Sequence, residues 1–496
     1  MDAISSPLVA LELRQRFQRE RVAKISFGDS NRGRTNSSLT RGYDWYMQRA
    51  LFETHAAPCW GVQFLPGGEM EIGSPPTPLA TTPNLGFRCE QNNNNTILKG
   101  APDPDVRQSG APSPQWQRLP GLGDQNPASV EEGLLAVNGY ARVLDGKVFT
   151  ASTGGQTFGI KIDLDHPIGT DQALKAIVAW SGELAGSGSF RPIAKEGGTP
   201  GFATIAQAPT IATNTGDNDL KITTLDMPVT SAGRDLKLNM IETGGTLPGP
   251  FLLYWLGAVN PAVTTGVCET THAALGGWSL RDLLLAIGSD DQPITGGNGQ
   301  TDEGVGTLLD ILATEVGPSK TLWVSLNFAI NDVNDAGLSL GPVGGLVSST
   351  PAGFGDNLRG VMNRIKRIAE ARGWTVFFDI VAGHPRTIND APLAALRAEA
   401  ATVANDYNAF ATDLSVLYPA AEILADGGYE DGLTEAGQAH QLNSDVVGYG
   451  KSADLLIGAI MESDFALFGS PTGPGGGVAS RSEAASIALA AAEDAL

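Results

Sequence analysis

Ser30 follows a short apolar run near the start of the chain, in the turn Gly28-Asp29-Ser30-Asn31. A serine at the carboxyl end of a strand in an open α/β sheet lies where such sheets bind their ligands. Its hydroxyl becomes a nucleophile when a neighbouring base accepts the proton. The Gly-Asp-Ser triplet is common in turns that do no chemistry, so its meaning depends on other segments.

Three further segments supply hydrogen-bond donors and a base. Gly276 and Gly277 precede a predicted helix start, where exposed backbone amides can receive negative charge. Asn331 follows the apolar run Leu322–Phe328 and offers a side-chain amide, and His440 precedes the last predicted helix of this region. A nucleophile, two donors for an oxyanion and a general base are the components of acyl transfer.

The elements that must position these residues alternate between strands and helices. Buried strands are predicted at Val22–Phe27, Leu322–Phe328 and Thr375–Val381. Apolar residues at helical spacing predict a helix over Leu358–Ile368, and another is predicted over Ala394–Phe410. This order predicts an α/β fold with a parallel sheet and helices on its faces.

Two stretches depart from that alternation. Residues 58–130 are rich in Pro, Gly and Asn without a sustained period, which predicts long loops with a few short strands. Residues 131–262 show short apolar or alternating runs between turn residues, which predicts a β-sandwich. Its strands are expected at Gly159–Leu164, Leu174–Trp180, Leu220–Leu225, Leu236–Glu242 and Phe251–Leu256.

Taken in order, the four segments resemble the SGNH (GDSL-type) hydrolase family, which is named for Ser, Gly, Asn and His in four sequence blocks. The resemblance covers residues 1–55 and 266–465. The matching residues are Phe27-Gly28-Asp29-Ser30, Gly276-Gly277-Trp278-Ser279 with Arg281-Asp282, Asn331-Asp332, and His440 followed by Gly448-Tyr449.

The resemblance implies a serine esterase that needs no metal or organic cofactor. Ser30 is the implied nucleophile and His440 the implied base. Gly277 and Asn331 are the implied oxyanion donors. His384 follows the Thr375–Val381 strand, and it either lines the same edge of the sheet or is a structural histidine.

The resemblance also implies a flavodoxin-like, three-layer α/β/α domain that is divided by an insertion. Residues 31–276 separate Ser30 from Gly277, whereas the family's first two blocks usually lie a few dozen residues apart. We therefore expect two parts of one hydrolase domain, a loop-rich insertion, a jelly-roll-like β-sandwich, and a Gly/Pro linker with an Ala-rich helix. Their expected bounds are 1–57 with 263–466, then 58–130, 131–262 and 467–496.

Two positions depart from the family pattern. Ala329 stands where the third block has glycine, and Gly437 stands where the family usually carries the aspartate that orients the histidine. Loss of such a carboxylate can lower the rate by several orders of magnitude. Glu435 or Asp431 can take its place, or a Ser–His pair with a backbone carbonyl can suffice. A decayed site in a protein kept for binding or assembly is the alternative.

Composition and charge exclude several other classes of function. The chain has 33 Lys+Arg against 54 Asp+Glu, a net charge of −21, which opposes binding to nucleic acid and to anionic lipid. No apolar run is long enough to span a membrane, and no Sec-type signal is recognised. Three cysteines cannot form a disulfide framework, and no zinc-type spacing is present.

The substrate that we expect is an O-acyl group, in particular O-acetyl, on a polysaccharide. This expectation is an analogy with carbohydrate-active esterases that carry a β-sandwich. The large insertions, the C-terminal helix and the lack of a Sec-type signal favour a virion or phage-tail protein that acts outside the cell. Residues 470–496 are then expected to hold a homo-oligomer or larger assembly. The alternative is a structural or glycan- or receptor-binding phage component with the same fold.

Overall fold

The structure is a computed structural model of the chain. It describes residues 3–28, 47–64, 87–92, 115–117, 147–150, 157–162, 166–181, 189–198, 201–212, 221–228, 235–242, 251–270, 273–274, 279–287, 303–334, 348–385, 390–425 and 451–461.

The chain begins with a helix, α1 (Pro7–Arg19), that leads directly into the strand β1 (Arg21–Gly28). Proline at the first helical position has its φ angle already set for a helix. Ala10, Leu13 and Phe17 form the buried face of α1, and all of β1 after its first residue is buried. Burial on both faces is typical of a central strand in a parallel sheet, as the sequence predicted.

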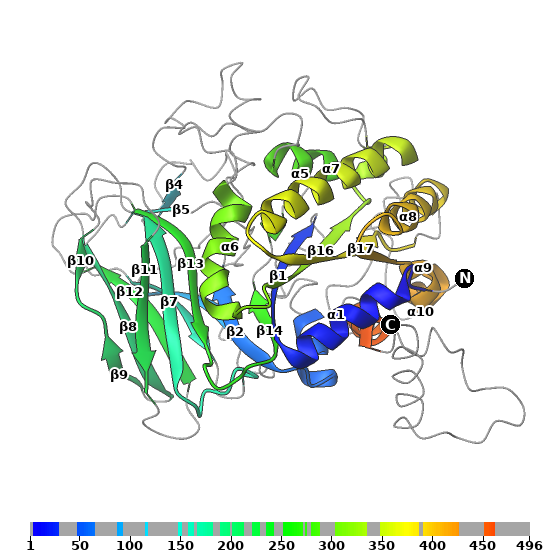
Figure 1. Cartoon of the computed structure of the whole chain (residues 1–496). Coiled ribbons are helices and arrows are strands. Elements are labelled where there is room, and N and C mark those ends of the chain that lie inside the picture. Colours follow the sequence, from blue (N-terminus) through cyan, green and yellow to red (C-terminus); the bar gives the residue numbers. More distant parts are fainter. Residues whose placement is uncertain are drawn as a thin grey trace, which may run out of the picture.

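The larger of two described sheets has 12 strands. Along its main path the strand order is β11-β7-β13-β2-β14-β1-β16-β17-β18 (Figure 1). From β2 to β18 every neighbouring pair is parallel. Without β2, the parallel strands lie in the order 2-1-3-4-5 of doubly wound sheets. The bounds of the other parallel strands are β2 (Cys59–Phe64), β14 (Gly266–Thr270), β16 (Thr321–Phe328), β17 (Thr375–Ala382) and β18 (Ala409–Thr412).

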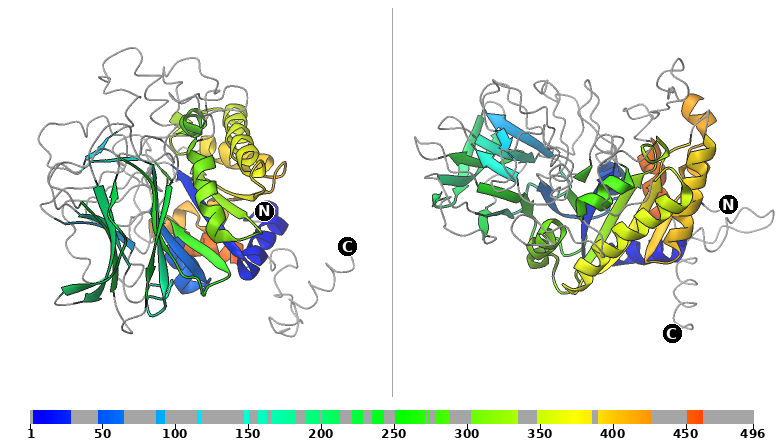
Figure 2. Two further views of the ribbon diagram at one scale, coloured as in Figure 1. Left: turned by 60° about the vertical axis from the view of Figure 1, so that its left-hand side comes forward. Right: turned by 90° about the horizontal axis from the view of Figure 1, so that it is seen from above.

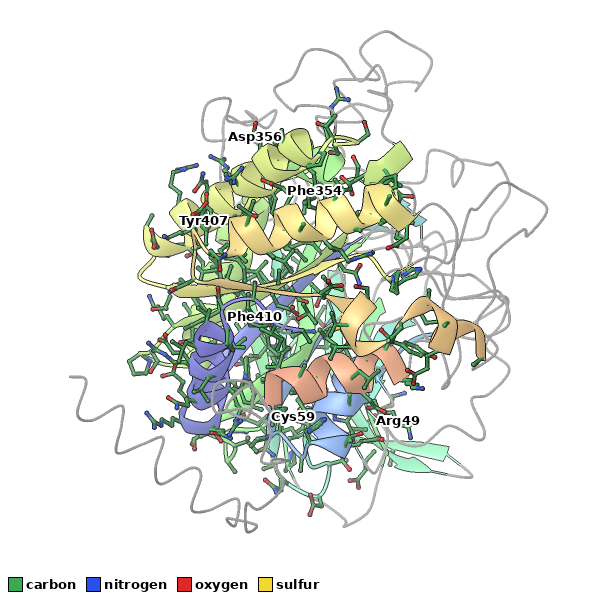
Figure 3. All side chains as sticks on the ribbon, turned by 90° about the vertical axis from the view of Figure 1, so that its right-hand side faces the viewer. Arg49, Cys59, Phe354, Asp356, Tyr407 and Phe410 are labelled. Carbon is green, nitrogen blue, oxygen red and sulfur yellow. The ribbon has the colours of Figure 1, made fainter. Side chains whose placement is uncertain are left out.

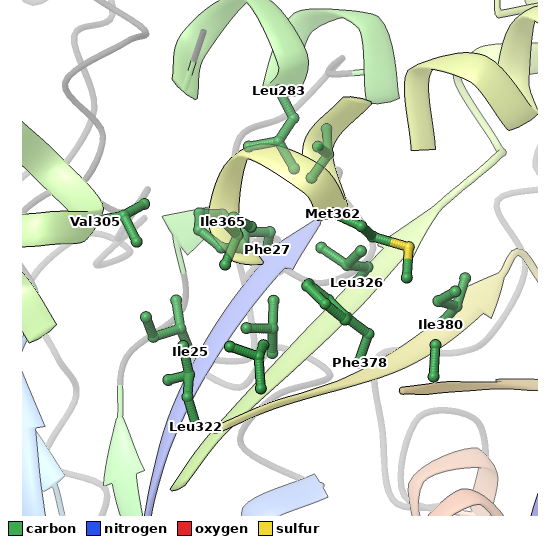
Figure 4. Close-up of a cluster of buried hydrophobic side chains, with 14 of the residues drawn as sticks. Ile25, Phe27, Leu283, Val305, Leu322, Leu326, Met362, Ile365, Phe378 and Ile380 are labelled. Carbon is green, nitrogen blue, oxygen red and sulfur yellow. The ribbon is translucent and has the colours of Figure 1, made fainter. Parts of the chain in front are cut away.

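Helices cover both faces of the parallel strands, so this part of the chain has three layers. On one face the apolar side chains of the strands pack against four helices, and Figure 4 shows part of this cluster. On the other face they pack against α1 and four shorter helices, and Figure 3 shows Phe354 and Phe410 on opposite sides of the sheet. The helices are α5 (Leu280–Ile287), α6 (Glu303–Val316), α7 (Pro351–Glu370) and α8 (Asp390–Ala404) on the first face, and η1 (Ala50–Thr54), α9 (Leu414–Leu417), α10 (Ala420–Ala425) and α11 (Lys451–Met461) on the second.

One predicted helix is too long. The helix expected over Ala394–Phe410 ends at Ala404, and β18 begins at Ala409. The polar residues between them form turns, in which the Asp406 amide donates to the Val403 carbonyl. Phe410 pairs with Asp379 of β17, so tertiary pairing decides the conformation of this short apolar run.

The β-rich segment contributes strands to the large sheet and forms a second sheet. β13 pairs with β7 and also with β2, so the large sheet continues from the β-rich segment into the parallel strands. Strands expected for this segment are confirmed, whereas a separate jelly-roll-like domain stays a prediction. The strands are β7 (Leu174–Ser181), β11 (Lys221–Met227) and β13 (Phe251–Val259), with β4 (Gln115–Gln117) and β5 (Lys147–Thr150) at their side.

The second sheet has six strands and lies against the β-rich end of the first (Figure 2). Ala194 and Leu238 from this sheet share one apolar cluster with Val178 and Trp180 of β7. The strands of the second sheet are β3 (Phe87–Asn92), β6 (Thr157–Ile162), β8 (Ser189–Gly198), β9 (Gly201–Gln207), β10 (Ile211–Ala212) and β12 (Asp235–Glu242).

The described helices include none that combines the length and the apolar character required to cross a bilayer. Cys59 and Cys268 are buried, and they are not joined to each other by a disulfide.

Candidate functional site

The carboxyl ends of three neighbouring strands meet in one row of the large sheet. Gly28, the last residue of β1, pairs with Asn327 of β16 on one side. On its other side it pairs with Ala274 of β15 (Ala273–Ala274), a short strand that also runs parallel to β1. Because all three strands run in the same direction, the segments that follow them leave the sheet at one edge. This is the edge at which open α/β sheets bind ligands.

The predicted site residues follow these strand ends in the sequence. Ser30 comes two residues after Gly28, and Gly277 comes three residues after Ala274. Asn331, three residues after the end of β16, is described and is half-buried. Ser30, Gly277, Asp431, Glu435 and His440 lie outside the described residues, so their positions stay predictions.

The turn between β16 and Asn331 has an unusual backbone. Ala329 has a φ angle of 104°, a conformation that glycine adopts far more readily than any residue with a Cβ atom. The turn continues into a short 3₁₀-helix, η3 (Asp332–Asn334). Non-glycine residues in such conformations cost about 1–3 kcal/mol and persist only where the surrounding structure holds them. The Ala329 position, where the SGNH pattern has glycine, is therefore the strained point of this turn.

Asp332 holds that turn and connects it to the helix α5. Its side chain is fully buried. One carboxylate oxygen, Oδ2, accepts a hydrogen bond of 2.9 Å from the Ala329 amide, and the other, Oδ1, accepts one of 2.8 Å from the Leu280 amide. Leu280 is the first residue of α5, where a negative charge also interacts favourably with the helix dipole.

The consequence is that one carboxylate fixes two of the segments that the sequence singled out. The Leu280 amide lies three residues after Gly277, and the Ala329 amide lies two residues before Asn331. Sequence reasoning identified Asn331-Asp332 as a motif but assigned no role to Asp332. Its position beside Asn331 was the available signal, whereas its two partners depend on the tertiary structure.

The end of β17 packs against the same turn. Gly383 has a φ angle of 69°, and a Cβ atom added to it would lie 3.3 Å from Ile330 Cδ1 and 3.3 Å from Leu393 Cδ2. His384 follows, with only 4% of its surface exposed. Of the two roles that the sequence left open for His384, this burial supports the structural one.

A buried polar pair deeper in the sheet was not anticipated. Ser325 of β16 donates a hydrogen bond of 2.8 Å from its hydroxyl to Asp379 Oδ2 of β17, and both side chains are fully buried. On the neighbouring strand β1, the Lys24 ammonium lies 5.3 Å from the centre of the ring of Trp323, which belongs to β16. Lys24 and Asp379 stand inside apolar runs of the sequence, which was the signal that could have identified them. Among the described residues, no group of three or more potential ligands could hold a metal ion.

The site can also be compared with known proteins. No family model matches this chain, and no curated protein matches it. Similar solved structures include a family two carbohydrate esterase from Cellvibrio japonicus, with 10% identity and a TM-score of 0.23 over 64% of this chain and 92% of that chain.

Two other similar structures cover much less of the chain. One structure from a study of carbohydrate-binding modules of the β-sandwich superfamily shows 15% identity and a TM-score of 0.17, over 22% of this chain and 47% of that chain. Tailspike protein 4 of bacteriophage CBA120 shows 11% identity and a TM-score of 0.16, over 22% of this chain and 15% of that chain. All three are low similarities, so the geometry of the strand ends remains the basis for any functional conclusion.

Proposed function

We propose that this protein is a serine ester hydrolase of the SGNH type, with its active site at the carboxyl edge of the parallel sheet. One observation carries the proposal: the ends of β1, β15 and β16 lie in one row, directly before Ser30, Gly277 and Asn331. Consecutive Cα atoms are about 3.8 Å apart, so chain connectivity keeps the Ser30 Cα within about 8 Å of Gly28. The carboxylate of Asp332 adds support, because it fixes the segments next to both proposed donors.

In the proposed mechanism, the Ser30 hydroxyl attacks the ester carbonyl while His440 accepts its proton. The negative charge that develops on the carbonyl oxygen is stabilised by the Gly277 amide, the Asn331 side-chain amide and the Ser30 amide. The intermediate then expels the alcohol, which takes the proton from His440, and leaves an acyl group on Ser30. A water molecule, deprotonated by His440, releases the acid and restores the serine.

The residue that orients His440 is part of the proposal. Gly437 stands where the family usually has an aspartate. Asp431 and Glu435 are the nearest preceding acidic residues, and we propose that one of them accepts a hydrogen bond from the imidazole. A Ser–His pair assisted by a backbone carbonyl is the other arrangement.

The proposed substrate is an acylated polysaccharide, in particular one with O-acetyl groups. We also propose that the protein acts as part of a virion or phage tail and assembles through residues 470–496. The large insertion between the first two blocks and the Ala-rich C-terminal segment motivate this part of the proposal. A truncation that ends at residue 469 should then have a smaller mass in solution than the full chain.

Hydrolysis of a small chromogenic acetate ester tests the proposed chemistry. We expect turnover by the wild type and a loss of at least about 10³-fold in Ser30→Ala, because removal of a catalytic nucleophile costs this much in related triads. Ser26→Ala is the matched control, since it makes the same change four residues earlier, on β1. The Ser26 hydroxyl is buried and has no hydrogen-bond partner among the described residues, so this variant should keep its activity.

A second candidate function is favoured by Gly437 alone: a decayed site in a structural or glycan-binding phage component. In that case the wild type and Ser30→Ala should be equally inert towards the chromogenic ester and towards acetylated polysaccharides. Equal turnover by the two proteins would instead show that Ser30 is not the nucleophile.

A further inference from the structure

Basic residues occupy one cross-strand row of the six-stranded sheet. Lys237 of β12 pairs with Lys161 of β6 on one side and with Lys195 of β8 on the other. Lys161 in turn pairs with Arg88 of β3. Four neighbouring strands thus place a basic residue at the same register position, and we call Arg88, Lys161, Lys237 and Lys195 the basic row.

The basic row lies on the outer face of the sheet. Leu236 and Leu238, on either side of Lys237, have 1% of their surface exposed and belong to the core between the two sheets. Ala194, next to Lys195, is fully buried in the same core. Because successive residues of a strand lie on opposite faces, the paired basic residues are placed on the face turned away from the core.

Within the described strands of this sheet, two acidic residues are placed on the same face as the basic row. Glu90 is two residues after Arg88 on β3, and Asp235 is two residues before Lys237 on β12. Both are diagonal neighbours, whereas the directly opposite residues within the row are basic. Like charges directly opposite each other destabilise a sheet. The arrangement is more unusual in a chain with a net charge of −21.

We propose that the basic row binds an anionic polysaccharide, one that carries carboxylate or sulfate groups along its chain. Neighbouring strands are about 4.8 Å apart, so the row spans roughly 14 Å. The distance between neighbouring strands, about 4.8 Å, is comparable to the length of one sugar residue in an extended polysaccharide. Anionic groups on successive sugar residues can therefore meet successive strands. Among anionic polymers, a polysaccharide is chosen because the proposed function already has a polysaccharide as its substrate.

This inference deepens the proposed function, and it rests on that function only in treating the bound polysaccharide as the substrate. Binding is therefore measured without turnover, by isothermal titration of the full-length protein with polygalacturonate, dextran sulfate and neutral dextran. The variant Lys161→Gln/Lys195→Gln/Lys237→Gln removes three positive charges from the row. The charge-retaining variant Lys161→Arg/Lys195→Arg/Lys237→Arg and the single change Lys366→Gln, on the distant helix α7, are the matched controls.

We expect the wild type to bind at least one of the two anionic polymers and not dextran. The glutamine variant should bind roughly tenfold more weakly or worse, and the slope of log Kd against log salt should fall by up to about 3. The arginine variant and Lys366→Gln should bind like the wild type. The glutamine variant should also melt no lower than the wild type at low salt, because like charges are removed.

Several results would overturn the inference. These are an absence of binding to both anionic polymers, equal binding by the glutamine variant, equal binding of neutral dextran, or tighter binding of a single-stranded oligodeoxythymidylate. Hydrolysis of the small acetate ester by the glutamine variant reports on the proposed esterase separately. If the glutamine variant hydrolyses the ester normally but no longer binds the polymer, both proposals are supported. If neither the wild type nor any variant hydrolyses the ester, only the proposed esterase activity is contradicted.

Discussion

At the scale of single residues, Asp332 is the side chain that most directly connects the fold to the proposed chemistry. Its carboxylate is buried and accepts hydrogen bonds from two backbone amides on different segments. Hydrogen bonds to a charged acceptor contribute about 1.5–3 kcal/mol each, and they also restrict the positions of both donors. Asp332 is therefore a positioning residue for the segments that carry Gly277 and Asn331.

Replacement of this carboxylate should lower catalysis more than binding. In Asp332→Asn, one of the two amides faces a side-chain NH₂ group instead of an oxygen. We expect kcat for the small acetate ester to fall about 10- to 100-fold, since oxyanion donors are worth about 10²–10³ in rate when removed outright. KM should change little. Asp356→Asn, which alters a largely exposed carboxylate on α7, is the control. A uniform rise in KM with unchanged kcat would contradict the positioning role.

At the scale of elements, the junction between α1 and β1 determines where Gly28 lies. Glu20 stands between the two elements, and its Oε1 accepts a hydrogen bond of 2.5 Å from the Thr321 hydroxyl at the start of β16. Burial acts to raise the pKa of the Glu20 carboxyl, but hydrogen bonds from Ser319, Thr321 and Arg16, with the charge of Arg16, leave the pKa lowered. The ionised form therefore connects α1 to the central strands.

The lowered pKa of Glu20 leads to a prediction about how the stability of the protein depends on pH. A carboxyl group whose pKa is lower in the folded state adds stability above its usual pKa, which is 4.5, and loses it as the pH falls through the folded value. Glu20→Gln should thus melt below the wild type at pH 7, and the difference should shrink below about pH 4. Glu12→Gln, at an exposed ion pair on α1, should show little effect at either pH. If the melting temperature of Glu20→Gln lies below that of the wild type by the same amount at every pH in this range, the charge of Glu20 is not the cause of the stabilisation.

At the scale of the whole molecule, Arg21 joins the β-rich segment to the α/β part at the edge opposite the proposed site. Its guanidinium donates to the carbonyls of Val263 at 2.7 Å, Glu315 at 2.7 Å and Asn260 at 2.8 Å, and it lies 5.4 Å from the centre of the Trp60 ring. Burial lowers the pKa of Arg21, although the nearby Glu315 opposes this effect. A guanidinium nevertheless stays charged in proteins.

Loss of this junction should destabilise the whole protein. A lysine ammonium cannot reach three carbonyls in the fixed geometry of a guanidinium, so Arg21→Lys should lower the free energy of unfolding by about 2–3 kcal/mol. Chemical denaturation followed by tryptophan fluorescence measures the change. Arg49→Lys retains the ion pair with Glu53 at the surface and should be within about 0.5 kcal/mol of the wild type. Similar free energies of unfolding for the two variants would contradict the stabilising role of Arg21 between the β-rich segment and the α/β part.

The sequence by itself determined the local features. The apolar runs of β1, β16 and β17 and the helical spacing of α7 identified an α/β arrangement, because burial on both faces and a period of 3.6 are local patterns. Residue types after the strands suggested acyl transfer, and strand direction explains why Asn331 lies at the expected edge. Residues 394–404 are helical as predicted, whereas residues 405–410 were misassigned because a short apolar run has no period of its own.

Only the tertiary structure decided how distant segments pair. The continuous sheet from β13 to β2, the two bonds of Asp332 and the basic row all join residues far apart in the chain. Their partners depend on register, and a shift of one residue would place Lys237 in the core and Leu238 outside. Register is set by the packing of the whole core, so these features of the site and its surroundings could not be read from any single segment.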